Sequence, residues 1–539
     1  MKPREHYFFT ALFVMLASFI MNAQAPTMGS AANFVVFSSD GAVSSNVTNS
    51  LATHLTGNVG TNTSGATSTG FGNVNGVMHD NDIASGLAAT DLLIAYNQLD
   101  ALIPTHFPSA LLGNGVTLNP GIYFINGEAV LNSTLILNGQ GNPNALFVFQ
   151  IEGAFSTNAL SQIILINGAL ACNVFWKVEG LVDIATGTKM KGTIVANNAA
   201  ILVGIDSTLE GRLLSTTGAI TVDGITAKLP LGCGSVILTG PLAPNLGSTV
   251  CYALFSGANN VTNIGVTHLK GDVGTNTGLT TGYNAANVVG TIHPIPDAST
   301  NQCAIDLLNV RTYLNALPQD IQLLYPSQFG NDLLLTPHTY ILSGATVFTN
   351  SLYLDAQNNA NAVFVIKICG ALSSSTYAKV ILLNGAQAKN VYWIVNGAVD
   401  INDYSEFSGT IVCNNGAANV STGAIIEGRL LTTSGALTSS AVTVNMTPGC
   451  TNLGIGDVEN SNKSIKLYPN PFAETLTIQV EETNISSIFT IYDVMGKEVM
   501  RKNITQMVTS MEVNLAPGMY FYKVMNYNRV IQTGKLISK

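Results

Sequence analysis

The chain has 539 residues, of which only 10% are charged, and its formal net charge is -9. Because a typical soluble protein has about 25% charged residues, the surface must consist largely of hydroxyl, amide, methyl and backbone groups. The acidic balance, with no run of basic residues in the long middle part of the sequence, argues against nucleic acid and anionic membranes as partners.

The N-terminus predicts a secretion signal. Lys2 and Arg4 precede an apolar run at 8–21, which small and polar residues follow at 22–25. This order is typical of a secretory signal peptide, and the run is shorter than the ~20 residues that a membrane-spanning helix needs. We therefore expect residues 1–25 to be removed and the mature protein to be exported without a membrane span.

A long part of the sequence then occurs in two similar copies. Two pairs of segments show this: GNVGTNT at 57–63 with GDVGTNT at 271–277, and NVFWKVEG at 173–180 with NVYWIVNG at 390–397. The offset between the copies is 214 residues for the first pair and 217 for the second. Such a period is too long for one solenoid repeat, so the copies are whole domains. We predict these domains at 26–235 and 236–450.

Short apolar strands recur at a smaller spacing within each copy. In the first copy, Trp176 and Ile194 are 18 residues apart, and Ile194 and Leu213 are 19 apart. Each interval pairs an apolar strand with an alternating one, and Gly or Asn turns separate them. An antiparallel sandwich also contains many short strands, but coils of this length favour a parallel β-solenoid in which each coil stacks on the last.

Each copy also contains one predicted helix, at 89–102 and at 303–317. In the first helix, apolar residues recur at helical spacing, at Leu92, Leu93, Tyr96 and Leu99. Pro104 and Pro318 follow the helices, as expected after a helix end. We expect each helix to bury its apolar stripe against a wall of the solenoid.

The seven cysteines include no CxxC pair, so zinc binding is not predicted. Export permits disulfides, but an odd number leaves at least one thiol unpaired. Cys233 and Cys450 end the two copies at equivalent positions. They could cap a domain through a disulfide or simply be small apolar residues, and the sequence does not decide the pairing.

The composition changes after a polar linker at 451–465, and residues 466–539 predict the strands of a small β-sandwich. This tail contains YPNP at 468–471, IYD at 491–493 and LAPGMY at 515–520. In these elements it resembles the C-terminal sorting domain of the type IX secretion system of Bacteroidetes. The resemblance implies export by that machinery, with the tail then removed or used for attachment to the cell surface.

The two copies resemble the bacterial and fungal ice-binding protein family, the domain of unknown function 3494. The resemblance rests on these elements of the first copy: GNVGTN at 57–62, the helix with Asp91, LINGA at 165–169, NVFW at 173–176, and Gly211 with Arg212. The second copy repeats their order through Trp393 and Arg429. The resemblance implies a right-handed β-solenoid of irregular triangular section, with a long helix along one wall and a flat face that adsorbs to ice.

Two groups of residues are candidates for that face. The first lies in the Thr-rich segments after the GTN motifs: Thr63, Thr67, Thr69, Thr277, Thr280, Thr281 and Asn284. Only the second copy strictly matches the T-A/G-x-T/N pattern of the family. The second group is expected on the outward side of alternating strands: Ser156, Thr221, Ser373, Ser375 and Thr438. Asp183 and Asp400 share that side, and they weaken an uncharged face unless they lie at its rim.

An enzyme is a rival class, and the duplication tests it. Four carboxylates of the first copy are not kept in the second: Glu152, Glu179, Asp206 and Asp223 become Cys369, Asn396, Gly423 and Ser440. The shared carboxylates are Asp183 with Asp400 and Glu210 with Glu427, and the nearby Arg212 indicates an ion pair with Glu210 at a turn. No acid–base pair is evident, and His79 and His293 lack further metal ligands. We predict no catalytic activity, metal or cofactor.

We therefore predict a secreted, monomeric ice-binding protein that inhibits ice growth and recrystallisation. Its predicted partners are the ice surface and the type IX secretion machinery, and the copy at 251–450 is the expected stronger binder. The alternative is a cell-surface adhesin or glycan-binding protein. That alternative predicts exposed aromatic residues in a cleft, whereas most aromatic residues of the two copies fall within apolar strands.

Overall fold

The computed structural model describes residues 24–539 except 47–52, 236, 447–464, 481–486 and 527–528. The predicted signal peptide and linker, apart from residues at their edges, and Cys450 therefore lie outside the described residues. The chain divides into two compact units, Met1–Cys450 and Thr451–Lys539, and each is described by itself.

The first solenoid has three walls of parallel strands. The helix wall has the strand order β5 (Met78–Asp80), β4 (Asn58–Thr61), β1 (Phe34–Ser38), β18 (Thr208–Ser215), β16 (Lys189–Ala196), β14 (Val174–Val178), β11 (Phe147–Ile151) and β8 (Gly121–Ile125). The bare wall has the order β2 (Val43–Ser45), β19 (Ile220–Val222), β17 (Ile201–Val203), β15 (Val182–Ile184), β12 (Phe155–Thr157), β9 (Ala129–Asn132) and β6 (Leu111–Gly113). The charged wall has the order β3 (His54–Thr56), β20 (Thr226–Lys228), β18, β16, β13 (Gln162–Ile166), β10 (Thr134–Asn138) and β7 (Val116–Leu118).

The second solenoid repeats these walls. Its helix wall runs β24 (Asp272–Thr275), β21 (Tyr252–Ser256), β40 (Ile425–Thr432), β38 (Glu406–Cys413), β36 (Val391–Val395), β33 (Phe364–Ile368), β30 (Thr339–Leu342) and β27 (Ile321–Leu323). Its bare wall runs β25 (Thr280–Thr281), β22 (Val261–Ile264), β41 (Leu437–Ser440), β39 (Ala418–Val420), β37 (Val399–Ile401), β34 (Leu372–Ser374), β31 (Thr346–Thr349) and β28 (Phe329–Gly330). Its charged wall runs β26 (Val288–Val289), β23 (His268–Lys270), β42 (Thr443–Asn445), β40, β38, β35 (Lys379–Leu383), β32 (Ser351–Asp355) and β29 (Leu333–Leu335).

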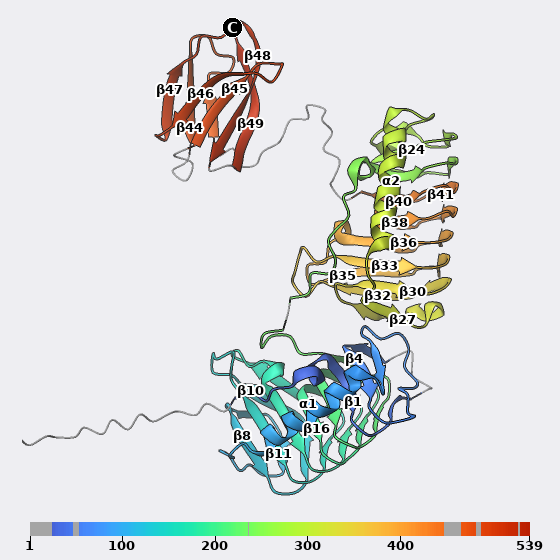
Figure 1. The fold of residues 1–539 in the computed structure, drawn as a ribbon, viewed down its shortest axis with the longest axis vertical. Coiled ribbons are helices and arrows are strands. Elements are labelled where there is room, and N and C mark those ends of the chain that lie inside the picture. Colours follow the sequence, from blue (N-terminus) through green and yellow to red (C-terminus); the bar gives the residue numbers. More distant parts are fainter. Residues whose placement is uncertain (1–23, 47–52, 236, 447–464, 481–486, 527–528) are drawn as a thin grey trace, which may run out of the picture. The chain divides into compact units, whose positions relative to one another are not determined.

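The prediction of tandem parallel β-solenoids is confirmed, but the coils do not stack in simple chain order. The N-terminal strand β1 lies between β4 and the late strand β18. Helix α1 (Ile83–Asp100) then carries the chain along the helix wall (Figure 1), and the coils climb back from β6 to β20. Its 18 residues span about 27 Å, which is five to six strand spacings.

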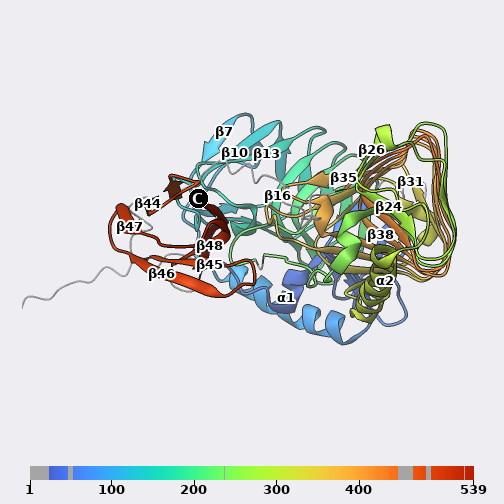
Figure 2. The same cartoon turned by 90° about the horizontal axis from the view of Figure 1, so that it is seen from above.

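The helices are confirmed, but both begin earlier than predicted. Asp82 caps α1 and Asp297 caps α2 (Ala298–Ala316), each in a capping box with the residue three positions on. A capping box satisfies two backbone amides of the first turn, so these boxes set the helix starts. Leu93 is 54% exposed, because α1 packs with a narrower stripe than its apolar pattern suggests. Seen almost along its axis, the second solenoid has superposed coils with α2 outside them (Figure 2).

The tail is the predicted small β-sandwich. One sheet has the antiparallel order β43 (Ile465–Tyr468), β44 (Thr475–Val480) and β47 (Val508–Glu512). The other has the antiparallel order β46 (Glu498–Ile504), β45 (Ser487–Tyr492), β48 (Gly518–Asn526) and β49 (Arg529–Ser538). Apolar residues from both sheets, Leu476, Phe489 and Leu536 among them, form its core.

A disulfide closes the end of the first copy. Cys233 bonds Cys172 across 61 residues of sequence, which favours the capping interpretation over a small apolar residue. Cys251 is also disulfide-bonded. Among the described residues, Cys303 and Cys413 are buried thiols and Cys369 is an exposed one.

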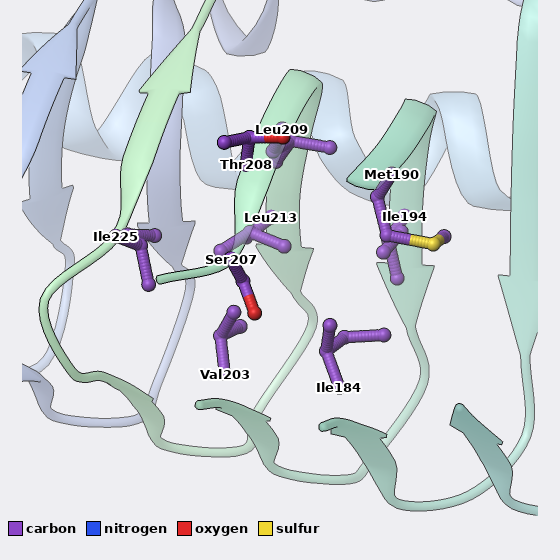
Figure 3. Close-up of a pocket in the computed structure, with 9 residues that line it drawn as sticks. All are labelled: Ile184, Met190, Ile194, Val203, Ser207, Thr208, Leu209, Leu213 and Ile225. Carbon is purple, nitrogen blue, oxygen red and sulfur yellow. The ribbon is translucent and has the colours of Figure 1, made fainter. Parts of the chain in front are cut away.

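The interior of the first solenoid contains a small apolar cavity beside Met190 (Figure 3). Its lining comprises Ile184, Met190, Ile194, Val203, Ser207, Thr208, Leu209, Leu213 and Ile225. At the position equivalent to Met190, the second solenoid has Phe407, which is 1% exposed and packs 5.7 Å from the ring of Trp393. The second copy thus fills with an aromatic ring the space that the first leaves open.

Met190→Phe is therefore expected to stabilise the first solenoid by about 1 kcal/mol, since cavity filling commonly adds that much. The reverse change, Phe407→Met, should destabilise the second solenoid by about 1–2 kcal/mol because it opens a cavity. Chemical denaturation of the full chain measures both. A loss of stability in Met190→Phe would show that the cavity is too small for the ring.

Candidate functional site

The bare walls present one central row of outward side chains per solenoid. In the first solenoid this row reads Ser44, Thr221, Leu202, Asp183, Ser156, Val130 and Leu111, in strand order from β2 to β6. An isolated parallel bridge between Ser44 and Thr69 extends the row by one residue. The flanking residues of each strand, such as Ile220 and Val222 beside Thr221, are buried. The alternation predicted for these strands therefore produces a continuous outward row.

The second solenoid has a more uniform row. It reads Thr281, Thr262, Thr438, Asn419, Asp400, Ser373 and Val347, in strand order from β25 to β31. The first three members are threonines on three adjacent strands in register. Stacked strands lie about 4.8 Å apart, so the three side chains repeat at that spacing. This threonine ladder is the most regular polar feature of either bare wall.

A column of alanines runs beside this row, two residues earlier on each strand. Its members are Ala436, Ala417, Ala398, Ala371 and Ala345, and backbone hydrogen bonds join neighbouring strands at four of them. All five are at least partly exposed. Because alanine side chains are short, they do not project beyond the threonine ladder.

Charge separates the bare wall from the charged wall. In the first solenoid, the charged wall carries Lys189, Lys191, Glu210 and Lys228 on neighbouring strands, and Lys191 pairs with Glu210 at 2.8 Å. The central row of each bare wall has a single charged residue. These residues, Asp183 and Asp400, lie on the inner strands β15 and β37 and therefore not at the rim of the wall. Asp400 accepts a hydrogen bond of 2.7 Å from Asn419 in the same row.

The walls bring together half of the residues that the sequence singled out. Thr69, Ser156, Thr221, Thr281, Ser373 and Thr438 all belong to the central rows. Thr67 precedes Thr69 by two residues and is exposed, and Ser375 follows Ser373 by two and is half-buried.

The other candidates lie elsewhere. Thr280 points inward and is 5% exposed, because the alternation puts Thr281 outside. Asn284 caps the short helix η5 (Ala285–Asn287) by accepting from the Ala286 amide. Thr63 accepts a hydrogen bond from the Thr61 hydroxyl in a turn, and Thr277 lies in the loop before β25. These four are placed by turns and packing and do not extend the rows.

Three polar residues of the rows, Ser44, Thr262 and Asn419, were not among the predicted residues. Ser44 and Thr262 each stand between a buried valine and a further residue of a short strand. The same alternation that identified Thr221 was present at both positions. Both strands precede the GTN motif of their copy.

Outside the bare walls, the densest group of charges surrounds Lys177 in the first solenoid. This ammonium is 2% exposed and lies 2.6 Å from Asp100, 2.8 Å from Glu179 and 3.0 Å from Glu152. The Tyr96 hydroxyl also donates to Glu179, at 2.8 Å. Burial by itself lowers the pKa of Lys177. The hydrogen bonds to the three carboxylates outweigh burial and raise the pKa above its ordinary value. The group fastens the C-terminal end of α1 to the wall.

Four further titratable residues that the sequence singled out, Glu210, Arg212, His79 and His293, also have structural partners. Glu210 pairs with Lys191 and not with Arg212, because β18 bends at Gly211 and puts the two side chains on different walls. Arg212 instead donates to the Ala32 carbonyl at 2.9 Å. His79 and His293 contact the helix caps Asp82 and Asp297 at 2.7 and 2.6 Å. Within the described ranges, no group of three His, Cys, Asp or Glu could hold a metal ion.

Comparison with known families assigns the solenoids. The model of the ice-binding-like family matches residues 42–228 and 255–445. The chain belongs to this family. A second model, the secretion system C-terminal sorting domain, matches residues 466–539, and the protein is accordingly a secreted one. In the part of the chain that the structure describes, no helix has both the length and the apolarity needed to cross a membrane.

Several relatives of this ice-binding-like chain are named for ice binding. An ice-binding protein of Nostoc sp. (strain HG1) is 36% identical over 241 residues, which cover 43% of this chain and 85% of the relative. Ice-binding protein 1 of Shewanella frigidimarina is 27% identical over 383 residues, which cover 65% of this chain and 42% of the relative. A crystal structure of an ice-binding protein from an Antarctic Flavobacteriaceae bacterium is 59% identical in sequence and superposes with a TM-score of 0.77. The match covers 80% of this chain and 100% of the chain in that crystal structure.

Proposed function

We propose that this secreted protein adsorbs to ice through its bare walls and thereby inhibits ice growth and recrystallisation. The observation that carries the proposal is the ladder of Thr281, Thr262 and Thr438 on adjacent parallel strands. The ice-binding relatives support it. The proposed ice-binding residues are those of the central rows.

The physical basis is a rigid, repeating array of hydroxyl and methyl groups. An ice surface offers no charge and no pocket, only a lattice of water molecules. Each threonine hydroxyl can hold an ordered water, and bridging waters are enthalpically nearly as good as direct hydrogen bonds. Because the strands already fix the side chains, little conformational entropy is lost on docking. Many weak contacts can therefore add up.

The two walls differ in their suitability. The second solenoid has the threonine ladder and the alanine column, whereas the first interrupts its row with Leu202, which is 41% exposed, next to Asp183. We therefore propose that the second solenoid contributes most of the ice affinity. Two carboxylates occur in both copies. Asp183 and its counterpart Asp400 lie on the bare walls, whereas Glu210 and its counterpart Glu427 lie on the charged walls. They cannot act together on one substrate, which favours adsorption over catalysis.

The test is thermal hysteresis and ice-recrystallisation inhibition by the full mature chain. We expect both activities at micromolar protein, and their absence would overturn the proposal. A glycan-binding role is the alternative, and binding to polysaccharide without any effect on ice would favour it. The names of the relatives do not favour that alternative.

For the mature chain we propose a monomer with solenoid domains at 26–235 and 236–450, a linker at 451–465 and the sorting domain at 466–539. Residues 1–25 would be removed during export. Mass spectrometry of the secreted protein would locate both processing sites, and sedimentation would measure its oligomeric state.

A further inference from the structure

At the end of the first solenoid that contacts the second, two asparagine side chains form hydrogen bonds with residues of the second solenoid. Asn75 is held in the first solenoid by its backbone, which bonds Leu55 and Gly57. Its side-chain amide donates to the Thr336 hydroxyl at 3.1 Å, and its amide oxygen accepts from the Tyr340 hydroxyl at 2.7 Å. Asn75, Thr336 and Tyr340 are 3%, 3% and 0% exposed.

Asn73 makes a second set of contacts of the same kind. Its amide nitrogen donates to the Tyr325 carbonyl, and its amide oxygen accepts from the Tyr325 amide, both at 2.9 Å. One side chain thus satisfies both backbone groups of a residue in the other solenoid, as a neighbouring strand would. A buried amide without a partner costs free energy, so loss of one partner within the docked junction would destabilise it.

At the outer ends of the solenoids, the residues equivalent to Asn75, Tyr325 and Thr336 are different ones. At the outer end of the second solenoid, Val289 stands at the position of Asn75 and is 73% exposed. At the outer end of the first solenoid, Pro108 and Asn119 stand where Tyr325 and Thr336 stand in the second. The two copies therefore differ where they meet, in the residues that join them.

The connecting segment also lies against the second solenoid. The Val363 amide donates to the Thr239 carbonyl at 2.9 Å. Asn359 donates to the Leu238 carbonyl at 3.1 Å, and the Tyr313 hydroxyl donates to the Leu242 carbonyl at 2.9 Å. This segment is thus fixed along the second solenoid and does not act as a free tether.

We propose that Asn73 and Asn75, with Tyr325, Thr336 and Tyr340, form a specific docking junction that locks the two solenoids into one rigid body. The junction, and not the length of the connecting segment, then sets the relation between the two bare walls. The proposal does not depend on what those walls bind.

Hydrogen exchange in the full chain tests the junction directly. The Tyr325 amide bonds Asn73, and the Thr336 amide donates to the Tyr340 hydroxyl at 3.0 Å, so both should be protected. Asn73→Ala with Asn75→Val should speed their exchange by about 10-fold or more, the effect of leaving buried groups unpaired. Asn287→Ala is the matched control, because Asn287 stands at the position of Asn73 at the outer end; it should leave both rates unchanged.

Tyr340→Phe tests the junction from the other side while removing a single oxygen. It should speed amide exchange at Thr336. When Tyr340→Phe and Asn75→Val are combined, the increase in exchange should be smaller than the two single effects predict together, since the two residues share one hydrogen bond. Unprotected Tyr325 and Thr336 amides in the parent chain would overturn the proposal. Strictly additive effects of Asn75→Val and Tyr340→Phe would overturn it as well.

Discussion

Replacing Thr262 with tyrosine is expected to remove most of the ice-growth inhibition of the chain, by about tenfold or more, as for a contact at the centre of a well-packed interface. Thr262 lies between Thr281 and Thr438 in the ladder. A tyrosine ring would stand above both neighbours and keep the wall away from a flat surface. Thermal hysteresis measured against protein concentration gives the size of the effect.

Thr443→Tyr is the matched control for this change. Thr443 is also a half-buried strand threonine of the second solenoid, but it lies on the charged wall. It should leave ice activity unchanged, and both variants should keep the stability of the parent. Equal losses at Thr262 and Thr443, or no loss at Thr262, would move the ice-binding site away from the bare wall. Thr280 is unsuitable for this test because its side chain is buried.

Replacing Lys177 with isoleucine, the residue that the second copy has at position 394, is expected to destabilise the first solenoid by about 3 kcal/mol. Breaking a buried ion pair typically costs 3–5 kcal/mol because a charge is left uncompensated. The lower end applies here, since Asp100 and Glu152 are partly exposed. Chemical denaturation of the full chain measures the loss.

The second copy indicates which further substitutions should restore the stability lost in Lys177→Ile. It has Asn315, Cys369, Ile394 and Asn396 where the first has Asp100, Glu152, Lys177 and Glu179, so the whole group is neutral there. Adding Asp100→Asn, Glu152→Gln and Glu179→Asn to Lys177→Ile should restore most of the lost stability. Failure of this combination would show that Lys177 stabilises the wall through packing of its stem and not through charge.

The charged group around Lys177 also predicts that the stability of the first solenoid depends on pH. Although burial works against it, hydrogen bonds from Lys177, Asn197 and Tyr96 lower the pKa of Glu179 below its ordinary value of 4.5. A lowered pKa stabilises the folded state above the unfolded value, and this stabilisation is lost as the pH falls through the folded value. The stability difference between the parent and Lys177→Ile should therefore narrow below about pH 4.5 and be constant at neutral pH.

The sequence by itself determined the domain plan of this protein. The repeated segments, the coil spacing near Trp176 and the apolar stripe of each helix are local patterns, and each corresponds to the structure. Alternation within short strands likewise predicted that Thr221 and Thr438 point outward, because side chains of a strand alternate between its two faces whatever that strand pairs with. The motifs of the tail were sufficient to recognise its sorting domain.

Only the tertiary structure decided which outward residues share a row. Ser44 stands beside Thr221, and Thr262 beside Thr438, because an N-terminal strand of each copy is inserted next to a strand from its end. No local pattern encodes a pairing between residues more than 170 positions apart, since the backbone hydrogen bonds that create it are the same for any side chain. For the same reason the junction at Asn73 and Asn75 appears only once the coils are stacked. The threonine ladder is therefore a property of strand register, which depends on how the whole solenoid closes.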